Sequence, residues 1–420
     1  MNILLINKSD KTGGAAVACK RLKDALNKNG ITAKMLVMEK LTSEKDIYQT
    51  SNKKISKYYY FLLFVAERIF FAFYEVSKKV RFAFSPANTG INISKNKLVK
   101  NADVIHIHWF NQGFLSINNL KQILDLNIPV VLTLHDMWAF TGGCHYSSDC
   151  LSYKNTCGNC KFLKKNGDND LSHKILQKKL KLYSKHNISI VTCSKWLKEK
   201  AQESTLLNKF KIINIPNPIN QEIYLKKEND DLKRKLNLPL NKKLILFGSA
   251  NIMDERKGFH YLKEALLDLN SDSANYKNEI ELVVFGKSNS EYLNSIPFIY
   301  HDLGIIKDEN TIVDIYNIAD LFVLPSLEDN LPNTIMESLA CGTPVVAFNT
   351  GGIPEMINHR QNGYIAEYKS ITDLKEGIKY LISHKNIEVL SKKAIIKVNE
   401  EYNEKIVARQ YSSLYKSIIK

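Results

Sequence analysis

Short apolar runs that alternate with helical patterns restrict the fold of this sequence more than any other feature. The runs lie at 2–7, 32–38, 103–109, 129–136, 189–194, 211–216, 243–250, 280–286, 321–326 and 344–349. Most are unbroken segments of Val, Ile and Leu, as in parallel strands that are covered on both faces. Segments with helical periodicity, such as 13–30 and 258–269, separate them. This alternation predicts a doubly wound α/β fold.

A proline-rich and charged stretch divides the strands into two series. Pro216 and Pro218 end the first series, and a charged linker precedes the strand at 243–250. The chain has 420 residues, too many for one ordinary core, so we expect two Rossmann-like domains of about 200 residues each that face a central cleft. The predicted parts are an amino-terminal domain at 1–216, a carboxy-terminal domain at 217–400, and an amphipathic helix at 401–420 that packs back on the first domain.

Composition and charge narrow the class of protein. Apolar residues make up 44% of the chain and aromatic residues 10%, which is typical of a packed protein rather than a disordered one. The formal charge of +16 comes mainly from lysines spread along the chain. Such a pattern favours a solvated surface biased toward anionic partners such as nucleotide phosphates or acidic lipids. No cleavable signal is recognised at the amino terminus, so a cytoplasmic protein is expected.

The longest apolar region, 58–76, is interrupted by Glu67 and Arg68. A helix that spans a membrane needs about 20 mostly apolar residues, and a central charge pair is costly there. The region is therefore predicted to be a buried or partner-facing helix. Because it is rich in aromatic residues and has lysines on both flanks, peripheral contact with the inner face of the cytoplasmic membrane is the alternative.

Two loops at predicted strand ends carry candidate functional residues in the first half. Gly13 and Gly14 follow the first strand and open a helix, where glycines let backbone N–H groups approach an anion. They do not form a Gly-x-Gly-x-x-Gly fingerprint, and a tight turn is the alternative. His135 and Asp136 follow a later strand, where a His can accept a hydroxyl proton or donate to a sugar or phosphate oxygen. A hydrogen-bonded loop anchor formed by the His-Asp pair is the alternative.

A cysteine cluster lies in a predicted insertion at about 142–165. Its spacing is Cys-x5-Cys-x6-Cys-x2-Cys, formed by Cys144, Cys150, Cys157 and Cys160. Four thiolates can bind a structural zinc ion, with His145 and His173 as alternate ligands, although only one Cys-x2-Cys pair is present. A disulfide or redox arrangement and unliganded packing are the alternatives. Cys19, Cys193 and Cys341 lie in apolar settings and are predicted to be core residues.

The second half holds the most informative stretch, PSLEDNLPNTIMESLACGTPVV at 325–346. Pro332 fits the start of a short helix and Gly342 fits the residue after its end. Ile335, Met336, Leu339 and Ala340 would form the buried stripe of that helix. Asp329 precedes the helix and Glu337 lies within it, so two carboxylates flank the N–H groups of a helix start. An anion site beside hydroxyl-binding acids suits a nucleotide sugar, and a helix cap with a solvent-facing Glu is the alternative.

The segment 325–357 strongly resembles the donor-site segment of retaining glycosyltransferases of family four, which have the GT-B fold. The matching residues are Ala340, Gly342, Pro344, Val345, Gly351, Gly352 and Glu355, with two acids separated by seven residues before them. Weaker similarity, including Gly13–Gly14 and Lys257–Gly258, extends over nearly the whole chain. The segment 135–150 is similar to a subset of bacterial members that build surface polysaccharides.

The resemblance implies transfer of a sugar from a UDP- or GDP-sugar to a hydroxyl of a glycan or lipid-linked acceptor, with retained configuration and no metal needed for the chemistry. It implies that Glu337 holds the ribose and Asp329 the sugar. Lys257 would neutralise the diphosphate together with the N–H groups near Asn333 and Thr334. In the first domain, Gly14 would let the loop close over the phosphates, and His135 would contact the sugar or the acceptor.

The sequence departs from the family pattern at two places. The first acid is Asp329 where the family has Glu, and Gly248–Ser249 stands where the family commonly has Gly-Arg. We hypothesise that Arg256 supplies the missing cation. A NAD-type oxidoreductase and a basic nucleic-acid-binding protein are the rival classes. The first lacks the tight glycine fingerprint, and the second lacks concentrated positive charge and paired zinc knuckles, so no nucleic-acid partner is expected.

Overall fold

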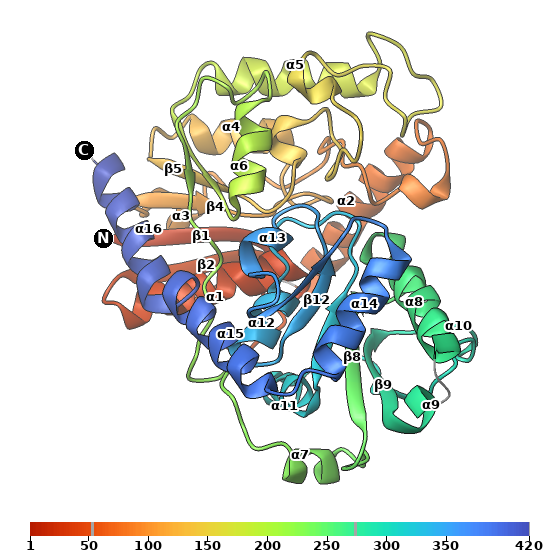
Figure 1. The fold of residues 1–420 in the computed structure, drawn as a ribbon. Helices are drawn as coiled ribbons and strands as arrows, with labels where there is room; N and C mark the ends of the chain where they lie inside the picture. The colour runs from red at the N-terminus through yellow and green to blue at the C-terminus, as the bar shows by residue number, and fades with distance from the viewer. Residues whose placement is uncertain (52–53, 273–274, 420) are drawn as a thin grey trace. The chain divides into compact units, whose positions relative to one another are not determined.

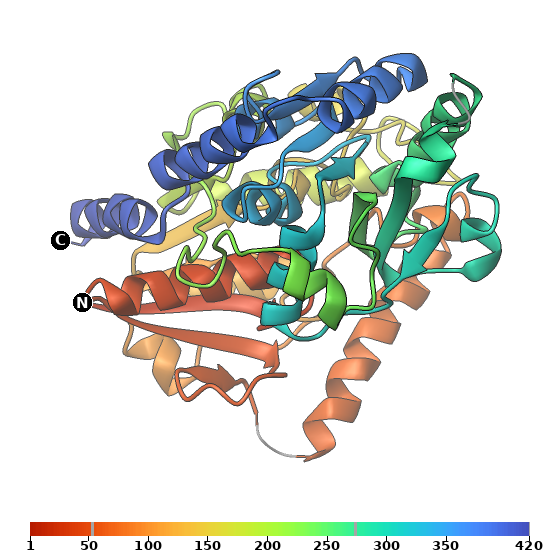
Figure 2. The same ribbon diagram turned by 60° about the horizontal axis from the view of Figure 1, so that its bottom comes forward.

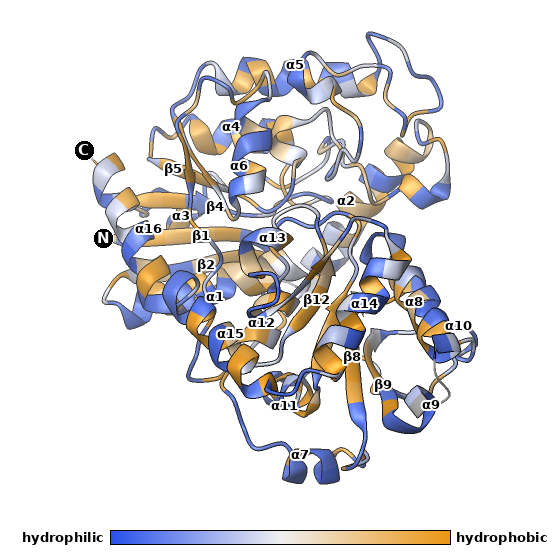
Figure 3. Cartoon of the chain, viewed as in Figure 1, coloured by the Kyte–Doolittle hydropathy of each residue, from blue (hydrophilic) through white to orange (hydrophobic). Residues whose placement is uncertain are grey.

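The computed structural model describes residues 1–51, 54–272 and 275–419. The chain divides into two compact units: unit 1 comprises Met1–Asn217 and Val407–Lys420, and unit 2 comprises Pro218–Ile406. Each unit is built on a parallel sheet with helices packed on it (Figure 1). The strands of both sheets are strongly hydrophobic (Figure 3), because parallel strands are covered on both faces.

Unit 1 contains a seven-stranded sheet in the order β3-β2-β1-β4-β5-β6-β7. Its strands are β1 (Asn2–Ser9), β2 (Thr32–Glu39), β3 (Ile47–Gln49), β4 (Val104–Ile107), β5 (Val130–Leu134), β6 (Ile188–Thr192) and β7 (Ile212–Asn214). Its helices are α1 (Gly14–Lys28), α2 (Lys54–Ala72), α3 (Lys97–Lys100), α4 (Ile117–Leu124), α5 (Leu171–Tyr183) and α6 (Lys195–Gln202). Three short 3₁₀ turns lie at η1 (Lys78–Val80), η2 (Trp138–Phe140) and η3 (Ser152–Lys154).

Two hydrophobic cores lie on the two faces of this sheet, since alternate residues of β1 join different cores. Leu4 and Ile6 pack with α4, α5 and α6. Ile3 and Leu5 pack with α1 and with the last helix, α16 (Glu404–Ile418), whose residues from Val407 onward belong to unit 1. Lys420, at the end of the predicted helix, lies outside the described residues.

Buried hydrogen bonds fasten α16 to the sheet of unit 1. The hydroxyl of Tyr415 lies 2.7 Å from His106 Nδ1, and His106 Nε2 lies 2.7 Å from Thr133 Oγ1. Tyr411 adds a contact of 3.2 Å to the same Thr133 hydroxyl. The last helix of the chain is therefore held by polar groups at the centre of the sheet as well as by apolar packing.

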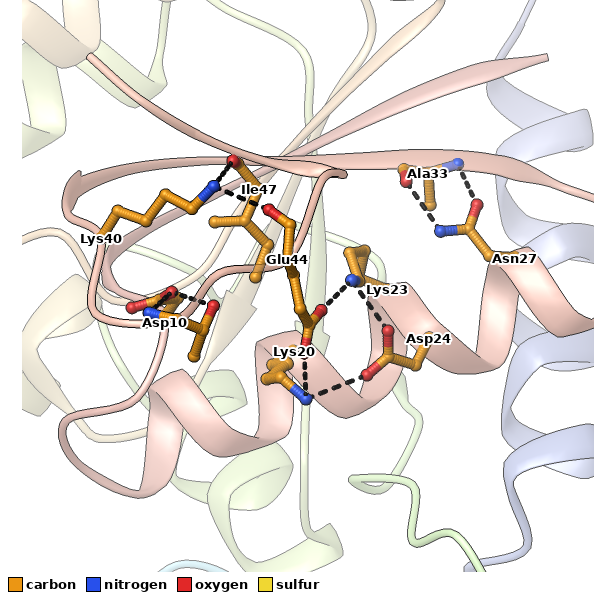
Figure 4. A network of polar contacts seen from close by, with 10 residues as sticks. Asp10, Lys20, Lys23, Asp24, Asn27, Ala33, Lys40, Glu44 and Ile47 are labelled. Carbon is orange, nitrogen blue, oxygen red and sulfur yellow. Dashed lines mark hydrogen bonds and ion pairs between the residues drawn. The ribbon is translucent and has the colours of Figure 1, made fainter. Parts of the chain in front are cut away.

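A polar network orders the loop between β2 and β3 (Figure 4). Lys23 of α1 is buried and bonds Glu44 at 2.6 Å and Asp24 at 2.8 Å. Asp10, just after β1, accepts hydrogen bonds from the backbone N–H groups of Leu41 and Thr42 at 2.8 and 3.0 Å. These contacts join the loop to α1 and to the segment that leads to Gly13.

Unit 2 contains a six-stranded sheet in the order β10-β9-β8-β11-β12-β13. Its strands are β8 (Lys243–Asn251), β9 (Ile280–Lys287), β10 (Tyr300–Asp302), β11 (Leu321–Leu324), β12 (Val345–Phe348) and β13 (Gly363–Ala366). Its helices are α7 (Asp230–Lys235), the 3₁₀ turn η4 (Glu255–Lys257), α8 (Phe259–Asp272), α9 (Asn275–Glu279), α10 (Ser290–Leu293), α11 (Glu309–Ile318), α12 (Asn333–Ala340), α13 (Ile353–Met356), α14 (Ile371–Ile382) and α15 (Ile387–Glu401). The strand order reverses between β8 and β11, and such a switch point is where open α/β sheets bind ligands.

Each of the ten predicted strands is present, and the described residues contain three more. These are β3, β10 and β13, which are three or four residues long and lie at the edges of their sheets. A strand this short shows little periodicity, and these three lack the consecutive Ile residues that mark β7, which is also short.

The Tyr415→Phe substitution tests the attachment of α16. It should lower the free energy of unfolding by about 1–3 kcal/mol, because His106 Nδ1 would be left buried without its partner. Urea unfolding followed by circular dichroism measures this difference. Tyr58→Phe, which removes the hydroxyl of an exposed tyrosine, is the matched control. An unchanged unfolding midpoint in Tyr415→Phe would show that the hydrogen bond contributes nothing to stability.

Candidate active site

The loop between β8 and α8 is shaped by Gly258, which has φ +71°. A Cβ atom at this position would lie 1.9 Å from the carbonyl oxygen of Pro325, so a larger residue would displace the backbone. Asp254 caps the turn by accepting a hydrogen bond of 3.0 Å from the N–H of Arg256. The close approach places Arg256 and Lys257 against the segment that follows β11.

The structure brings together the predicted residues Arg256, Lys257 and Asp329. Lys257 Nζ lies 2.5 Å from Asp329 Oδ2, and Arg256 Nη1 lies 3.5 Å from the same oxygen. Arg256 Nη1 also donates to the carbonyl of Glu328 at 2.8 Å. Two cations and one acid therefore form a single cluster at the carboxyl ends of β8 and β11.

Burial and mutual charge set the protonation of this cluster. Burial lowers the pKa of Lys257, Arg256 lowers it further, and Asp329 acts in the opposite direction. Burial acts to raise the pKa of Asp329, but the charges of Lys257 and Arg256 outweigh it and hold that pKa below its usual value. Asp329 is consequently ionised at neutral pH and holds the Lys257 amine in place.

Gly351 and Gly352 fix the backbone of Asp329 from the other side. The N–H of Gly352 donates to the carbonyl of Asp329 at 3.0 Å. Gly351 has φ +58°, and a Cβ atom there would lie 1.9 Å from the same carbonyl oxygen. Gly351 of the sequence motif is thus required for the close backbone approach, and Gly352 contributes its N–H.

Helix α12 begins with Pro332 at its N-cap and is followed by Gly342 with φ +78°. The predicted stripe of Ile335, Met336, Leu339 and Ala340 is buried. Asn333 and Thr334 at the start of the helix are half-buried, and their end of the helix carries its partial positive charge.

Glu337 of α12 is only 7% exposed, so the alternative of a solvent-facing Glu is wrong. Its carboxylate accepts a hydrogen bond of 3.0 Å from the hydroxyl of Tyr316 on α11. The sequence did not point to Tyr316, because a tyrosine in an amphipathic helix is indistinguishable from an ordinary core residue. The phenol orients one carboxylate oxygen of Glu337.

Two buried serines near this cluster were also missed as site residues. Ser249 lies in β8 and Ser326 follows β11, the neighbouring strand. The Oγ atoms of both are buried and lack a hydrogen-bond partner among the described residues. Buried hydroxyls are almost always paired, so these two suggest contact with a ligand. The family pattern marked Ser249 as a departure, but the burial and pairing of the two hydroxyls are tertiary properties for which the sequence carries no signal.

In unit 1, His135 lies at the carboxyl end of β5 and is half-buried. Its Nε2 lies 2.9 Å from His108 Nδ1, and its Nδ1 lies 3.7 Å from Cys193 Sγ. Burial lowers the pKa of His135 to about 4, although Asp136 acts to raise it. His106 and His108 share one face of the sheet, with ring centroids 4.2 Å apart.

Asp136 serves as a loop anchor, which was the alternative reading of the His-Asp pair. It accepts hydrogen bonds from the N–H of Trp138 at 2.8 Å and from Trp109 Nε1 at 3.0 Å. It also lies 2.7 Å from His145 Nδ1. Asp136 therefore holds the segment after β5 in place, and His135 is the candidate for ligand contact.

Gly13 is the N-cap of α1 and has φ +92°. A Cβ atom at this position would meet no other atom within 4 Å. The glycine is thus favoured by backbone conformation, and the space beside it is open. This geometry is compatible with both readings of the sequence, a tight turn and close approach of a ligand to Gly13 and Gly14.

The four cysteines of the insertion lie near one another, and a structural zinc ion there stays a prediction. Burial raises the pKa of the Cys144 thiol, and Cys160, Cys157 and Cys150 are near enough to raise it further. Nevertheless, across 1–51, 54–272 and 275–419 no three His, Cys, Asp or Glu side chains are arranged to hold a metal ion. The four cysteines are free, and burial raises the pKa of Cys157 and of Cys160 to about 11.

The alternate zinc ligands have other partners. His145 Nε2 lies 2.9 Å from Ser85 Oγ, in addition to its contact with Asp136. His173 Nδ1 lies 3.0 Å from the carbonyl oxygen of Thr156. Of the alternatives left open by the spacing, unliganded packing fits these contacts. Cys19, Cys193 and Cys341 are buried core residues, as predicted.

Two family models together match most of the chain. The model described as Glycosyltransferase Family 4 matches residues 12–223, about half of the sequence. The model described as Glycosyl transferases group 1 matches residues 228–398. The first match falls in unit 1 apart from its last residues, and the second lies in unit 2.

Several named proteins are similar in sequence. The N,N'-diacetylbacillosaminyl-diphospho-undecaprenol alpha-1,3-N-acetylgalactosaminyltransferase of Campylobacter jejuni is 30% identical over 202 residues, which are 47% of this chain and 51% of that protein. The match therefore spans about half the length of that relative. The N-acetyl-alpha-D-glucosaminyl L-malate synthase of Bacillus anthracis is 21% identical over 333 residues, 76% of each protein.

Solved structures share the fold over nearly the whole chain. Sucrose-phosphate synthase from Thermosynechococcus elongatus has a TM-score of 0.69 at 16% identity, covering 99% of this chain and 98% of that one. Anabaena HepE in complex with UDP-glucose has a TM-score of 0.65 at 15% identity, covering 99% and 100%. HepE was also solved with UDP.

The buried histidines of unit 1 predict a pH dependence of stability. Burial lowers the pKa of His106 to about 3 and that of His135 to about 4, and holds the pKa of His108 well below its usual value. The unfolded chain takes up protons at these rings below a pKa of about 6.5, whereas the folded chain does not. The free energy of unfolding should therefore fall as the pH drops from about 7 to about 5, by about 1.4 kcal/mol per pH unit for each fully buried ring.

Urea unfolding at a series of pH values measures this slope. His106→Asn should reduce it, and His260→Gln, which replaces an exposed histidine, is the control. A stability that stays flat over the range would contradict the neutral state of the buried rings.

Proposed function

Because the chain belongs to glycosyltransferase family 4, we propose that it transfers a sugar from a UDP- or GDP-sugar to a hydroxyl of a glycan or lipid-linked acceptor, with retention of configuration. The observation that carries this proposal is the cluster of Arg256, Lys257 and Asp329 beside the start of α12. The expected GT-B fold class is confirmed by the two parallel Rossmann-like sheets and by the solved structures that share the fold. Because the chain matches glycosyltransferase families, the two rival function classes, an oxidoreductase and a nucleic-acid-binding protein, are excluded.

The diphosphate of the donor is assigned to the cations of unit 2. A compact ammonium such as Lys257 and a guanidinium fork such as Arg256 suit adjacent phosphate oxygens. Backbone N–H groups at Asn333 and Thr334 add the positive end of the α12 dipole. HepE, which shares this fold, binds UDP and UDP-glucose, which supports a nucleotide-sugar donor.

The two carboxylates are assigned to the hydroxyl groups of the donor. Glu337, oriented by Tyr316, would accept hydrogen bonds from the ribose hydroxyls. Asp329 would accept them from the transferred sugar. The unpaired hydroxyls of Ser249 and Ser326 would donate to oxygen atoms of the bound donor, with Ser249 standing where the family commonly has an arginine.

Stabilisation of the charge on the leaving diphosphate drives the proposed reaction. The bond between the anomeric carbon and the diphosphate oxygen breaks, the acceptor oxygen bonds to the same carbon, and the acceptor proton passes to the departing diphosphate. Negative charge develops on the diphosphate, where Lys257, Arg256 and the N–H groups of α12 stabilise it. These groups supply the positive charge of the leaving-group site from the protein itself, so the proposed chemistry requires no metal ion.

Residues 1–216 are proposed as the acceptor-side domain and 217–400 as the donor domain. His135 has a lowered pKa and is therefore neutral near pH 7. Its ring would contact the sugar or the acceptor hydroxyl, and Gly13 and Gly14 would approach the phosphates. We place the enzyme in the cytoplasm, at the inner face of the membrane when the acceptor is lipid-linked.

Glu337→Gln tests the ribose assignment. It should weaken UDP or GDP binding by about 10- to 100-fold, since a hydrogen bond to a charged group contributes about 1.5–3 kcal/mol. Isothermal titration of the nucleotide measures the change, with Glu376→Gln on the exposed part of α14 as the control. An effect confined to acceptor affinity would overturn the assignment.

Arg256→Ala tests the replacement of the missing arginine. It should lower kcat by about 100-fold or more, because charge stabilisation at the leaving group is lost in the transition state. Donor hydrolysis over a panel of nucleotide sugars measures it and identifies the base and the sugar. Near-normal turnover in Arg256→Ala would contradict the hypothesis that Arg256 replaces the missing arginine. Stabilisation by NAD or oligonucleotides, but not by nucleotide sugars, would overturn the proposed function itself.

A further inference from the structure

Helix α2 buries its central charged residues and exposes apolar ones, the reverse of an ordinary amphipathic helix. Its two charged residues in mid-helix, Glu67 and Arg68, are buried and form an ion pair. Glu67 also accepts a hydrogen bond of 3.1 Å from the N–H of Gly113, and Arg68 donates at 3.1 Å to the carbonyl of Phe84. The charge pair that interrupts the apolar run in the sequence therefore faces the interior of unit 1.

The opposite side of α2 exposes large apolar side chains. Tyr58 is 74% exposed, and the other exposed members on the helix are Ile55, Tyr59, Phe61, Leu62 and Ile69. Most of them recur at intervals of three, four or seven residues, so they form one stripe along the helix. We call this stripe, with its continuation below, the α2 face.

The α2 face continues into the segment after the helix. Phe73 is 77% exposed, and Tyr74, Val76 and Phe82 are exposed as well. Backbone hydrogen bonds from Val76 to Phe162 and from Lys164 to Tyr74 hold this segment in place, so the exposure belongs to ordered backbone. Figure 2 shows α2 as the long helix that follows the first grey trace.

Positive charge surrounds the α2 face. Between positions 47 and 102 the sequence has two acids, Glu67 and Glu75, and both are buried. Glu75 bonds Arg81 at 3.0 Å. Among the described side chains of α2, of η1 and of 162–166, the segment bonded to the chain after α2, the exposed charged residues are lysines, namely Lys57, Lys78, Lys79, Lys164 and Lys165.

We infer that the α2 face docks this protein on the surface of an anionic lipid bilayer. Aromatic and aliphatic side chains would enter the boundary between headgroups and acyl chains, and the lysines would contact lipid phosphates. In the part of the chain that the structure describes, no helix is both long and apolar enough to cross a membrane. The helix therefore fits an orientation along the bilayer surface, with its buried ion pair on the protein side.

The charge distribution favours a bilayer over a second copy of the chain. Two copies joined through the α2 face would bring their lysines together without acids to neutralise them. Anionic headgroups supply the opposite charge over the whole area. This inference concerns the site of action and does not depend on the sugar transferred.

Cosedimentation of the full-length protein with vesicles tests the inference. Binding to phosphatidylcholine vesicles that contain phosphatidylglycerol should exceed binding to phosphatidylcholine alone. The combined substitutions Tyr58→Ser, Phe61→Ser and Phe73→Ser should weaken binding by about ten-fold or more. Lys78→Glu with Lys79→Glu should remove the preference for anionic lipid, since each surface lysine contributes about five-fold.

A matched control carries serine at three exposed apolar residues of unit 2, Leu240, Ile299 and Ile305, and should bind vesicles like the wild type. Nucleotide binding and the thermal midpoint should be unchanged in all variants, which separates this inference from the proposed function. Equal loss of vesicle binding in the control would overturn it. A second result would also overturn the inference: the wild type does not bind vesicles, and sedimentation velocity shows a dimer that the triple variant does not form.

Discussion

The contact between Lys257 and Asp329 is the interaction around which unit 2 is organised. Two glycines make it possible, because Gly258 and Gly351 each bring their backbone so close to the 325–329 segment that a Cβ atom would overlap a carbonyl oxygen. The loop after β8 and the turn after β12 therefore pack closely against the backbone of the segment that follows β11. An acid, two cations and a helix start then meet at one edge of the sheet, and the expected donor chemistry follows from that concentration of charge.

Unit 1 is organised by polar groups of a different kind. His106, Thr133 and Tyr415 form a buried hydrogen-bonded chain that links the centre of the sheet to the last helix of the protein. Burial keeps the neighbouring rings neutral, so His135 faces its surroundings as an uncharged imidazole. The sheet of unit 1 thus holds the carboxy-terminal helix and also carries His135, the candidate for ligand contact, at the carboxyl ends of its strands.

The sequence indicated the strands, the boundary between the two strand series and the donor motif, because these depend on local patterns. Continuous apolar runs identified the central strands, and the spacing of Pro332 and Gly342 identified α12. The sequence could not show whether the four clustered cysteines bind a metal ion, since metal binding depends on the relative directions of four side chains from separate turns. Nor could it identify Ser326 and Tyr316, or show that the Ser249 hydroxyl is buried, because burial depends on distant residues.

Helix α2 separates the two kinds of information most clearly. Its apolar content and its interruption by Glu67 and Arg68 are visible in the sequence, and both follow from composition alone. Which side of the helix faces the interior was decided by tertiary contacts, since the Gly113 N–H and the Phe84 carbonyl satisfy the charge pair inside unit 1. The sequence by itself determined the family, the strands and the residue types of the candidate site in unit 2. Only the tertiary structure decided which polar atoms are paired and which apolar side chains remain exposed, because burial and pairing depend on neighbours that are far away along the chain.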